Sequence, residues 1–322
     1  GGLSKGQNLH QVFTYMEIMD KLKLQKMEED VFDKILIEGD PKEYVYAQGY
    51  ENFIQHLLKD FPEEEKALRA YCDKIKEVCS KFPLYNLRSG GDINEKTTVL
   101  EIDTKTFIES ITDNETLRGV LAGNNTLYAG QADKTPLYVH AMILNSYIES
   151  SWKCVDGGSA IGKYIAKNIR QRGGEIRRHA EVKKIVVEDG AVTHVVMADG
   201  SKVYGKHFIS NMHPVQTLEM TETDMIKAAY RSRVKNLENT VSSIIVNVVF
   251  KKDSIPYNKH NYYYQKKGEV WNMTDYTPEN WPLGYALFFS ASSKTEKFAE
   301  SMTILAYMKF DDVKQWAGTF NT

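Results

Sequence analysis

The sequence predicts a mixed α/β fold with two interleaved parts, because a helix and a compact β-meander stand between a helix-rich region and a strand-rich region. The length of 322 residues fits about two domains, and no internal repeat or low-complexity linker divides the chain. With 42% hydrophobic and 26% charged residues, the composition is that of an ordinary globular protein. We therefore expect residues 153–218 to form one part, and the segments 1–152 and 219–322 to form the other, discontinuous part.

Strands come first in the discontinuous part, and helices follow. VFDKILIEG and KEYVYA are typical of two short strands, since Gly39-Asp40-Pro41 between them is a turn signal. Residues 50–80 have a helical pattern that breaks at Pro62, and proline suits the first position of the next helix. Further helices are expected over residues 104–121 and 136–151.

Beyond residue 240 the chain is rich in β-branched and aromatic residues, which indicates strands. The strand-like stretches are SSIIVNVVFKK, NYYYQ, YALFFSAS and MTILAYMKF. Their aromatic side chains form either ordinary core or, with the helix Pro136–Ser151, the wall of a channel for a long apolar substrate. These aromatic residues are Tyr262, Tyr263, Tyr264, Trp271, Trp281, Tyr285, Phe288 and Phe289.

The central block opens with glycines that only partly match a dinucleotide-binding loop. Gly157, Ser159 and Gly162 occupy the three glycine positions of G-x-G-x-x-G, so one glycine is missing. The preceding SSWKCVD is not a buried strand, whereas the fingerprint needs one so that the following helix points its N-terminus at the pyrophosphate. We therefore expect no literal pyrophosphate loop here.

The rest of the central block predicts a helix and three strands. Three isoleucines spaced four apart, beginning at Ile161, form one apolar stripe on the helix, and Gly173-Gly174 ends it. HAEVKKIVVE, AVTHVVMA and SKVYGKHFISN follow as strands. Asp189-Gly190 and Asp199-Gly200 join them as tight hairpin turns.

Composition and missing motifs exclude several classes of function. A net charge of −2 leaves no electrostatic footprint for nucleic acid, and the eight histidines show no metal-binding spacing. Neither G-x-S-x-G nor G-K-[ST] occurs. Cys72, Cys79 and Cys154 make no disulfide framework, which favours a reducing, cytoplasmic compartment. No apolar run approaches the ~18 residues of a spanning helix, and the chain starts without Met, so we expect a processed product or a piece of a longer protein.

The order of these features resembles one family. A glycine pair, a helix, GGEI, AEV, EDG, ADG and a terminal SN before proline are similar to the central block of carotenoid desaturases of the phytoene-dehydrogenase type, and especially of the retinol saturases. HAMILNSYIESSWKCVDGGS, GGLSKGQNLHQVFTYMEIMDKLKL and VYAQGYENFIQHLLKDFPEE also resemble segments of this family. Val155-Asp156 departs from it, since the family often has proline and a basic residue there.

The resemblance implies a remnant of an FAD/NAD(P)-binding-type domain over residues 153–218, interleaved with an amine-oxidase-like substrate domain. It implies FAD as the cofactor and leaves NAD or NADP open as the electron donor. The family's N-terminal G-x-G-x-x-G strand and its glycine-rich C-terminal segment do not occur in this sequence. We therefore expect this chain alone to bind FAD weakly or not at all, and to be inactive.

The same resemblance implies contacts to FAD. Val182 would offer its backbone N–H and C=O to the adenine, Gly157 and Gly158 would let the chain pass close to the cofactor domain, and Asn211 would end the meander near the flavin. Each position has an ordinary alternative: a core strand position, a helix-entry turn, and a polar cap for the helix that begins near Pro214. The catalytic residues stay unknown, and no metal is expected.

Three functions stay open. The resemblance implies a parent enzyme that uses FAD to saturate or desaturate carbon–carbon double bonds of a retinoid- or carotenoid-like isoprenoid, an apolar lipid reached by peripheral contact with a membrane. The second reading is an amine-oxidase-type flavoenzyme. The third is a non-catalytic module whose aromatic strands hold a lipid or a glycan. A strand with G-x-G-x-x-G upstream in the parent gene would separate the two flavoproteins from the module.

Overall fold

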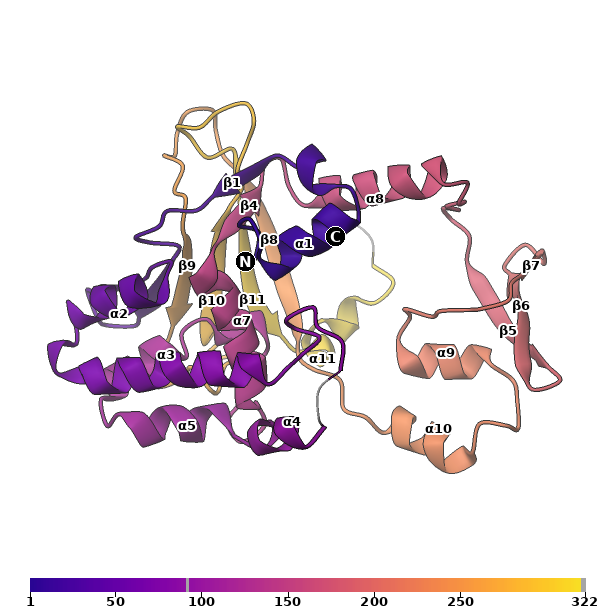
Figure 1. Ribbon diagram of the computed structural model, residues 1–322, viewed down its shortest axis with the longest axis horizontal. Coiled ribbons are helices and arrows are strands. Elements are labelled where there is room, and N and C mark those ends of the chain that lie inside the picture. The colour runs from indigo at the N-terminus through magenta and orange to yellow at the C-terminus, as the bar shows by residue number, and fades with distance from the viewer. Residues whose placement is uncertain (91–92, 320–322) are drawn as a thin grey trace. The chain divides into compact units, whose positions relative to one another are not determined.

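The computed structural model describes residues 1–90 and 93–319, and its contacts divide the chain into two compact units (Figure 1). The first unit joins Gly1–Asn168 to Val241–Thr322, and the second unit is Ile169–Thr240. One unit is therefore inserted into the other. The assignment of residues 153–218 to a cofactor domain stays a prediction, since the units are defined by contacts alone.

A six-stranded sheet forms the centre of the first unit, in the order β3-β2-β9-β10-β11-β8. Only β2 and β9 pair in parallel among these described strands, and the other neighbours are antiparallel. The strands are β2 (Asp33–Ile37), β3 (Glu43–Tyr46), β8 (Ser242–Val249), β9 (Asn261–Gln265), β10 (Gly284–Phe289) and β11 (Ser301–Met308). The predicted mixed α/β fold and these predicted strands are confirmed.

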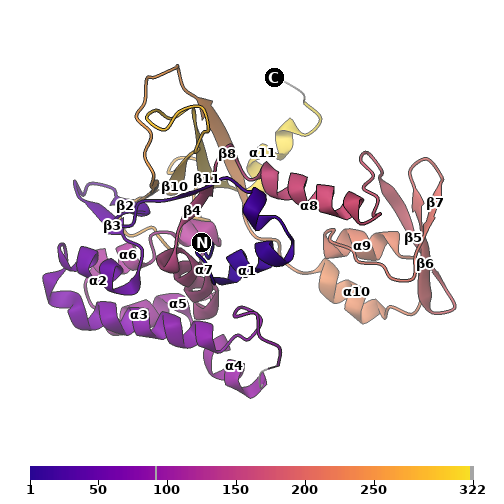
Figure 2. The ribbon, with the colours of Figure 1, turned by 45° about the horizontal axis from the view of Figure 1, so that its top comes forward.

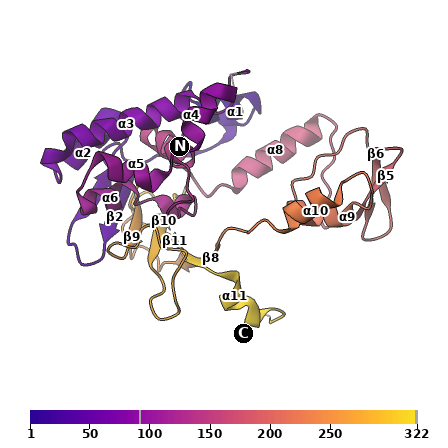
Figure 3. The ribbon, with the colours of Figure 1, turned by 90° about the horizontal axis from the view of Figure 1, so that it is seen from below.

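Helices α2, α3, α5 and α7 form a layer on one face of this sheet (Figures 2 and 3). Pro62 opens a 3-10 turn before α3 rather than the α-helix itself. The sequence did not predict α1 and α4. The helices of this unit are α1 (Asn8–Tyr15), α2 (Tyr50–Leu58), α3 (Glu65–Ser80), α4 (Ile93–Leu100), α5 (Thr104–Ile111), α6 (Glu115–Leu121), α7 (Leu137–Glu149) and α11 (Phe310–Val313).

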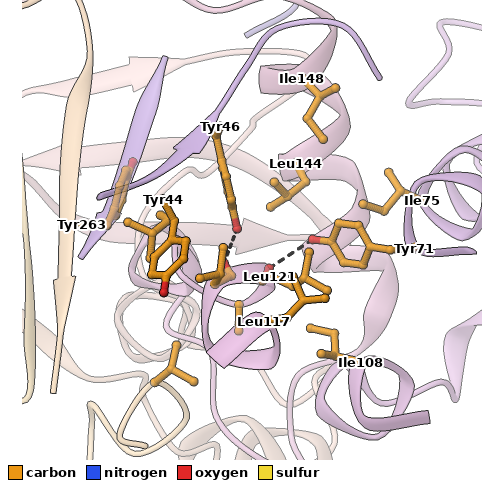
Figure 4. Packing of buried hydrophobic residues seen from close by; sticks show 14 of the residues in the cluster. Tyr44, Tyr46, Tyr71, Ile75, Ile108, Leu117, Leu121, Leu144, Ile148 and Tyr263 are labelled. Carbon is orange, nitrogen blue, oxygen red and sulfur yellow. Dashed lines mark hydrogen bonds between the residues drawn. The ribbon is translucent and has the colours of Figure 1, made fainter. Parts of the chain in front are cut away.

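The main core lies between the sheet and these helices (Figure 4). Alternation along β9 turns Tyr263 into this core and leaves Tyr262 and Tyr264 half-buried on the other side. Buried tyrosines reach backbone carbonyl groups: the Tyr46 hydroxyl donates to Val120, and the Tyr71 hydroxyl donates to Leu121 at 3.1 Å. The core is thus apolar in composition, and these hydroxyls still have partners.

The opposite face of the sheet, which we call the outer sheet face, is apolar as well. A sheet face in contact with water normally alternates to polar side chains. The strand registers instead place aliphatic and aromatic residues there, most of them half-buried. The register also places Lys34 there, beside Tyr262. The apolar residues that we call the outer sheet face are Leu36, Ile244, Val246, Val248, Tyr262, Tyr264, Tyr285, Leu287, Phe289, Met302 and Ile304.

A second, smaller core joins the N-terminal helix to the start of α8 (Ser159–Gln171). Phe13 and Ile18 are buried there, and Ile161 and Ile165 of the predicted stripe pack against them. Beside this core, β1 (Leu24–Lys26) pairs with β4 (Trp152–Cys154). Three residues of SSWKCVD thus form a short strand with a distant segment, which the sequence did not predict, but none of the three is buried, as expected.

The second unit holds the predicted meander as a separate sheet in the order β5-β6-β7. Gly190 and Gly200 adopt positive φ in the two predicted hairpin turns. The last strand is shorter than predicted and stops at Tyr204, and α10 was not predicted. The elements are β5 (Val182–Glu188), β6 (Ala191–Met197), β7 (Lys202–Tyr204), α9 (Pro214–Met220) and α10 (Ala228–Lys235).

Candidate cofactor and substrate site

The glycine pair lies in a tight turn that leads from β4 into α8. Asp156 and Gly157 have φ angles of 62° and 91°, in the left-handed region that glycine tolerates best. The Asp156 N–H donates to the Ala291 carbonyl at 2.9 Å, and the Asp156 carboxylate accepts from the Ser293 N–H at 2.8 Å. The Ser293 hydrogen bond also lowers the pKa of Asp156 from its usual value. The turn is thus tied to the loop that follows β10.

Open space surrounds the glycines of this turn. A Cβ atom on Gly157, Gly158 or Gly162 would meet no other atom within 4 Å. Packing within the first unit therefore does not require glycine at any of the three positions. Only at Gly157 does the backbone angle φ favour glycine. An uncovered glycine turn at a helix start agrees with the predicted close approach of a cofactor domain, which stays a prediction.

Val182 stands on the edge strand of the sheet in the second unit. It pairs with Met197, and the Ala198 N–H donates to the Glu181 carbonyl at 2.8 Å. Hydrogen-bonded and non-hydrogen-bonded pairs alternate along an antiparallel ladder, so Val182–Met197 is a non-hydrogen-bonded pair. The N–H and C=O of Val182 therefore point away from β6, toward the edge. A donor and an acceptor side by side at that edge fit the backbone contacts expected for adenine.

Asn211 lies exposed in the connection between β7 and α9. The neighbouring Ser210 hydroxyl is 2.8 Å from that of Thr217. The α9 helix is capped by His213, whose Nδ1 accepts from the Val215 N–H at 3.3 Å. The capping role expected as the alternative for Ser210–Asn211 is thus performed by His213, two residues later than Asn211.

Gly157 and Gly158 belong to the first unit, and Val182 and Asn211 belong to the second. The edge peptide of Val182 and the open glycine turn both fit a dinucleotide cofactor, but a strand that runs into G-x-G-x-x-G does not occur in this sequence. The described residues therefore fit part of an FAD site. Among these residues no group of three histidine, cysteine or carboxylate side chains is placed to hold a metal.

The expected channel wall was wrong for the helix Pro136–Ser151, and for the strands after residue 240 it stays a prediction. Helix α7 packs into the main core, where Leu137, Ala141, Leu144 and Ile148 are fully buried. It therefore does not line a channel. The strands after residue 240 do present apolar side chains away from that core, on the outer sheet face. Sequence reasoning missed Leu36 of this face, because the apolar run Ile35-Leu36-Ile37 does not show which of its side chains face the core.

No described helix is both long enough and apolar enough to cross a membrane.

The fold is that of FAD/NAD(P)-binding-type oxidoreductases. An oxidoreductase from Methanosarcina mazei matches with a TM-score of 0.57 and 16% identity, over 94% of this chain and 66% of that one. A putrescine oxidase double mutant, redesigned in cofactor binding, matches with a TM-score of 0.52 and 10% identity, over 97% of this chain and 64% of that one. Identities this low establish the fold alone.

Sequence comparison then defines the family. The model of the flavin containing amine oxidoreductases matches residues 10–319, and the chain belongs to this family. Membership implies FAD as the cofactor and confirms the predicted resemblance, since relatives with carotenoid- and retinol-related names are found as well.

The all-trans-retinol 13,14-reductase of Rattus norvegicus is 23% identical over 88% of this chain and 53% of its own length. That of Danio rerio is 27% identical over 50% of this chain and 29% of its own. The chloroplastic prolycopene isomerase of Daucus carota is 27% identical over 50% of this chain and 29% of its own. The chain thus spans about half, or less, of the length of these curated relatives.

Proposed function

We propose that this chain is the substrate-binding part, with a piece of the cofactor domain, of an FAD-dependent oxidoreductase that acts on carbon–carbon double bonds of a retinoid- or carotenoid-like isoprenoid. The family supports a flavin-dependent oxidoreductase. The names of the relatives, retinol reductase and prolycopene isomerase, support a conjugated isoprenoid as the substrate class.

The single observation that carries the substrate class is the outer sheet face. Its eleven apolar side chains span β2, β8, β9, β10 and β11. The charged side chain that the register adds beside Tyr262 is Lys34, which is ion-paired with Glu43 of the edge strand β3. A polyene offers almost no hydrogen bonds, so its binding energy must come from buried apolar area. About 300 Å² buried at about 25 cal/mol per Å² gives roughly 8 kcal/mol, the gross equivalent of micromolar affinity.

The chain's own residues bind and orient in this proposal. The outer sheet face holds the polyene flat and excludes water from it, and Val182 holds the adenine through its edge peptide groups. FAD, when bound, supplies the hydride or electron transfer. The substrate is drawn from a membrane surface that the protein touches peripherally.

The test uses the full-length parent protein, loaded with FAD and supplied with a chemical reductant. Retinoids, carotenoids and small amines are incubated separately, and products are separated by chromatography. We expect a change in the double bonds of a polyene. Turnover of an amine without turnover of any polyene would favour the amine-oxidase reading, which the family name also supports.

A pair of adjacent variants locates the substrate. Val246 points to the outer sheet face and is 44% exposed, whereas Ile245 points to the opposite face of β8 and is 54% exposed. We expect Val246→Asp to raise the KM for the polyene and Ile245→Asp to leave it unchanged. Equal effects of the two variants would remove the outer sheet face from the proposed site.

A further inference from the structure

A cavity of about 700 Å³ opens in the first unit at the carboxyl ends of β2 and β9. These two strands are the parallel pair of the sheet, and ligand sites in α/β proteins favour the carboxyl ends of parallel strands. The register places Gln265 opposite Gly284, at the other end of β10 from Phe289. The cavity is therefore separate from the α8 entry turn, which is tied to the loop after Phe289.

The floor of the cavity combines apolar side chains with one buried amide. Ile37, Ile108 and Trp271 line it and are almost completely buried. Gln265 lines it as well and is 2% exposed. Its Nε2 donates to the Gly119 carbonyl at 2.9 Å, while its Oε1 has no hydrogen-bond partner among the described residues. A buried carbonyl oxygen without a donor is costly, so this site favours a ligand that brings one.

Seven charged residues line the cavity, and two of its three cationic side chains already have partners in the protein. The Arg118 guanidinium donates to the carbonyls of Thr112 and Glu109 and to the Asp113 carboxylate. Lys105 lies 3.9 Å from Glu109. The charged residues are Glu38, Asp40, Lys105, Glu109, Glu115, Arg118 and Lys267.

Among the charged groups of the rim that have no ion pair with a described residue, carboxylates outnumber cations. Asp40 accepts from the Tyr44 hydroxyl at 2.7 Å and from the Lys42 N–H at 3.0 Å. Glu38 has only a contact of 3.5 Å with the Tyr264 hydroxyl, and Glu115 has no ion pair in the described part of the chain. Lys267 is the cation on this rim without an ion pair among the described residues. The rim therefore has unused acceptors on two side chains, Glu38 and Glu115.

We propose that this cavity binds a small organic ammonium ion, with its hydrocarbon body against Trp271 and its N–H donors directed to the carboxylates of Glu38 and Glu115. Its volume lies within the range of small-molecule sites. None of the eleven residues of the outer sheet face lines the cavity, although Glu38 contacts Tyr264 of that face at 3.5 Å, and the proposal does not depend on the isoprenoid function.

The test compares three probes of one shape on the 322-residue chain. Benzylamine, benzyl alcohol and benzoate carry a cationic, a neutral and an anionic group on the same ring. Binding is measured by isothermal titration calorimetry and by saturation-transfer NMR. We expect benzylamine to bind most tightly, with a dissociation constant on the order of 1 mM or tighter, followed by the alcohol. Benzoate binding as tightly as benzylamine would overturn the proposal.

Variants that remove either a negative or a positive charge from the rim test the proposed contacts. The two carboxylates are exposed, so Glu38→Gln and Glu115→Gln should each weaken benzylamine about two- to fivefold. Lys267→Gln removes a cation that repels the ammonium group, so it should strengthen benzylamine binding by a similar factor. Glu63→Gln, an exposed substitution outside the cavity, is the matched control and should change nothing. Each variant is first checked for an unchanged thermal transition. If benzylamine affinity is the same in all four, the amine does not bind at this rim.

Discussion

His140 shows how a polar residue is accommodated in the main core. Its Nε2 lies 2.6 Å from the Tyr71 hydroxyl, and its Nδ1 lies 2.6 Å from the Tyr128 hydroxyl. The single proton of the Tyr71 hydroxyl goes to the Leu121 carbonyl, so His140 donates through Nε2 and accepts from Tyr128 through Nδ1. Burial lowers the pKa of His140 to about 3, which keeps the ring neutral.

Removing one member of this chain of hydrogen bonds should be costly. Tyr128→Phe leaves Nδ1 of His140 buried without a donor, so we expect a loss of about 1–3 kcal/mol in the free energy of unfolding. Urea denaturation followed by tryptophan fluorescence measures it. Tyr285→Phe, on the half-exposed outer sheet face, is the control and should cost less than about 0.5 kcal/mol. Equal losses in both variants would contradict the assigned hydrogen bonds.

Asp33 is a carboxyl group at the buried start of β2. Burial raises its pKa to about 7, against the opposing effects of a hydrogen bond from Asn261, at 2.8 Å, and of the charge of Lys153. Burial also lowers the pKa of Lys153 to about 8. The folded chain therefore holds a proton on Asp33 over a pH range in which the unfolded chain has lost it.

The pH dependence of stability follows from this difference. The contribution of Asp33 is fully present below about pH 4, falls as the pH rises to about 7, and is then lost. His140 and His260 act in the opposite direction, since their lowered pKa values make stability rise toward about pH 6.5. In Asp33→Asn only the first effect disappears. The variant should gain stability relative to the wild type between pH 4 and 7, by at most on the order of 4 kcal/mol.

Denaturation of both proteins at pH 4, 5, 6 and 7 tests this prediction, because the histidine contributions cancel in the difference. A difference that does not change with pH would show that Asp33 titrates normally in the folded chain.

At the scale of elements, the entry turn of α8 depends on backbone angle rather than on space. A methyl group at Gly157 or at Gly158 meets nothing, but only Gly157 has a positive φ. Gly157→Ala should therefore destabilise the turn by about 1–2 kcal/mol, and Gly158→Ala should be neutral. Hydrogen exchange of the α8 amides, compared between the two variants, measures this. Faster exchange in the Gly158 variant alone would contradict the prediction.

The elements that the sequence predicted are those whose pattern is local. Aromatic composition identified β9 from five residues, and the four-residue spacing of isoleucines identified α8. Strand β4 escaped prediction because its partner β1 lies more than a hundred residues earlier, and no local pattern marks such a pair. Helix α10 escaped because Ala228–Lys235 has only short apolar residues and one tyrosine, without an apolar stripe. The cavity also escaped, since its lining comes from four separate segments.

At the scale of the whole molecule, the two units differ in the quality of their cores. In the second unit, all of whose residues are described, the buried hydrophobic residues are Ile185, Leu218 and Val234, each 8–9% exposed. The first unit buries a large cluster in which many side chains have no exposed area. The inserted unit should therefore be the less stable of the two.

This difference has a spectroscopic test, since all four tryptophans lie in the first unit. Tryptophan fluorescence then reports on the first unit, whereas circular dichroism reports on both. We expect part of the dichroism signal to be lost at lower urea than the fluorescence transition. Ile185→Ala should lower only that early transition, by about 1–3 kcal/mol. Coincident transitions by both probes would show that the units unfold together.

The parallel pairing of β2 with β9 has a consequence for how the chain is made. β2 ends at Ile37 and β9 begins at Asn261, so the ribosome must add more than two hundred residues before the centre of the sheet exists. At about 5–20 residues per second this takes on the order of 10–40 s. During that time the edge of β2 stays unpaired, while the meander of the inserted unit, whose partners are neighbours in the chain, is free to form. The inserted unit ends at Thr240, about twenty residues before β9 begins, so the nascent chain can complete its smaller unit while its larger one is still open to holdase chaperones.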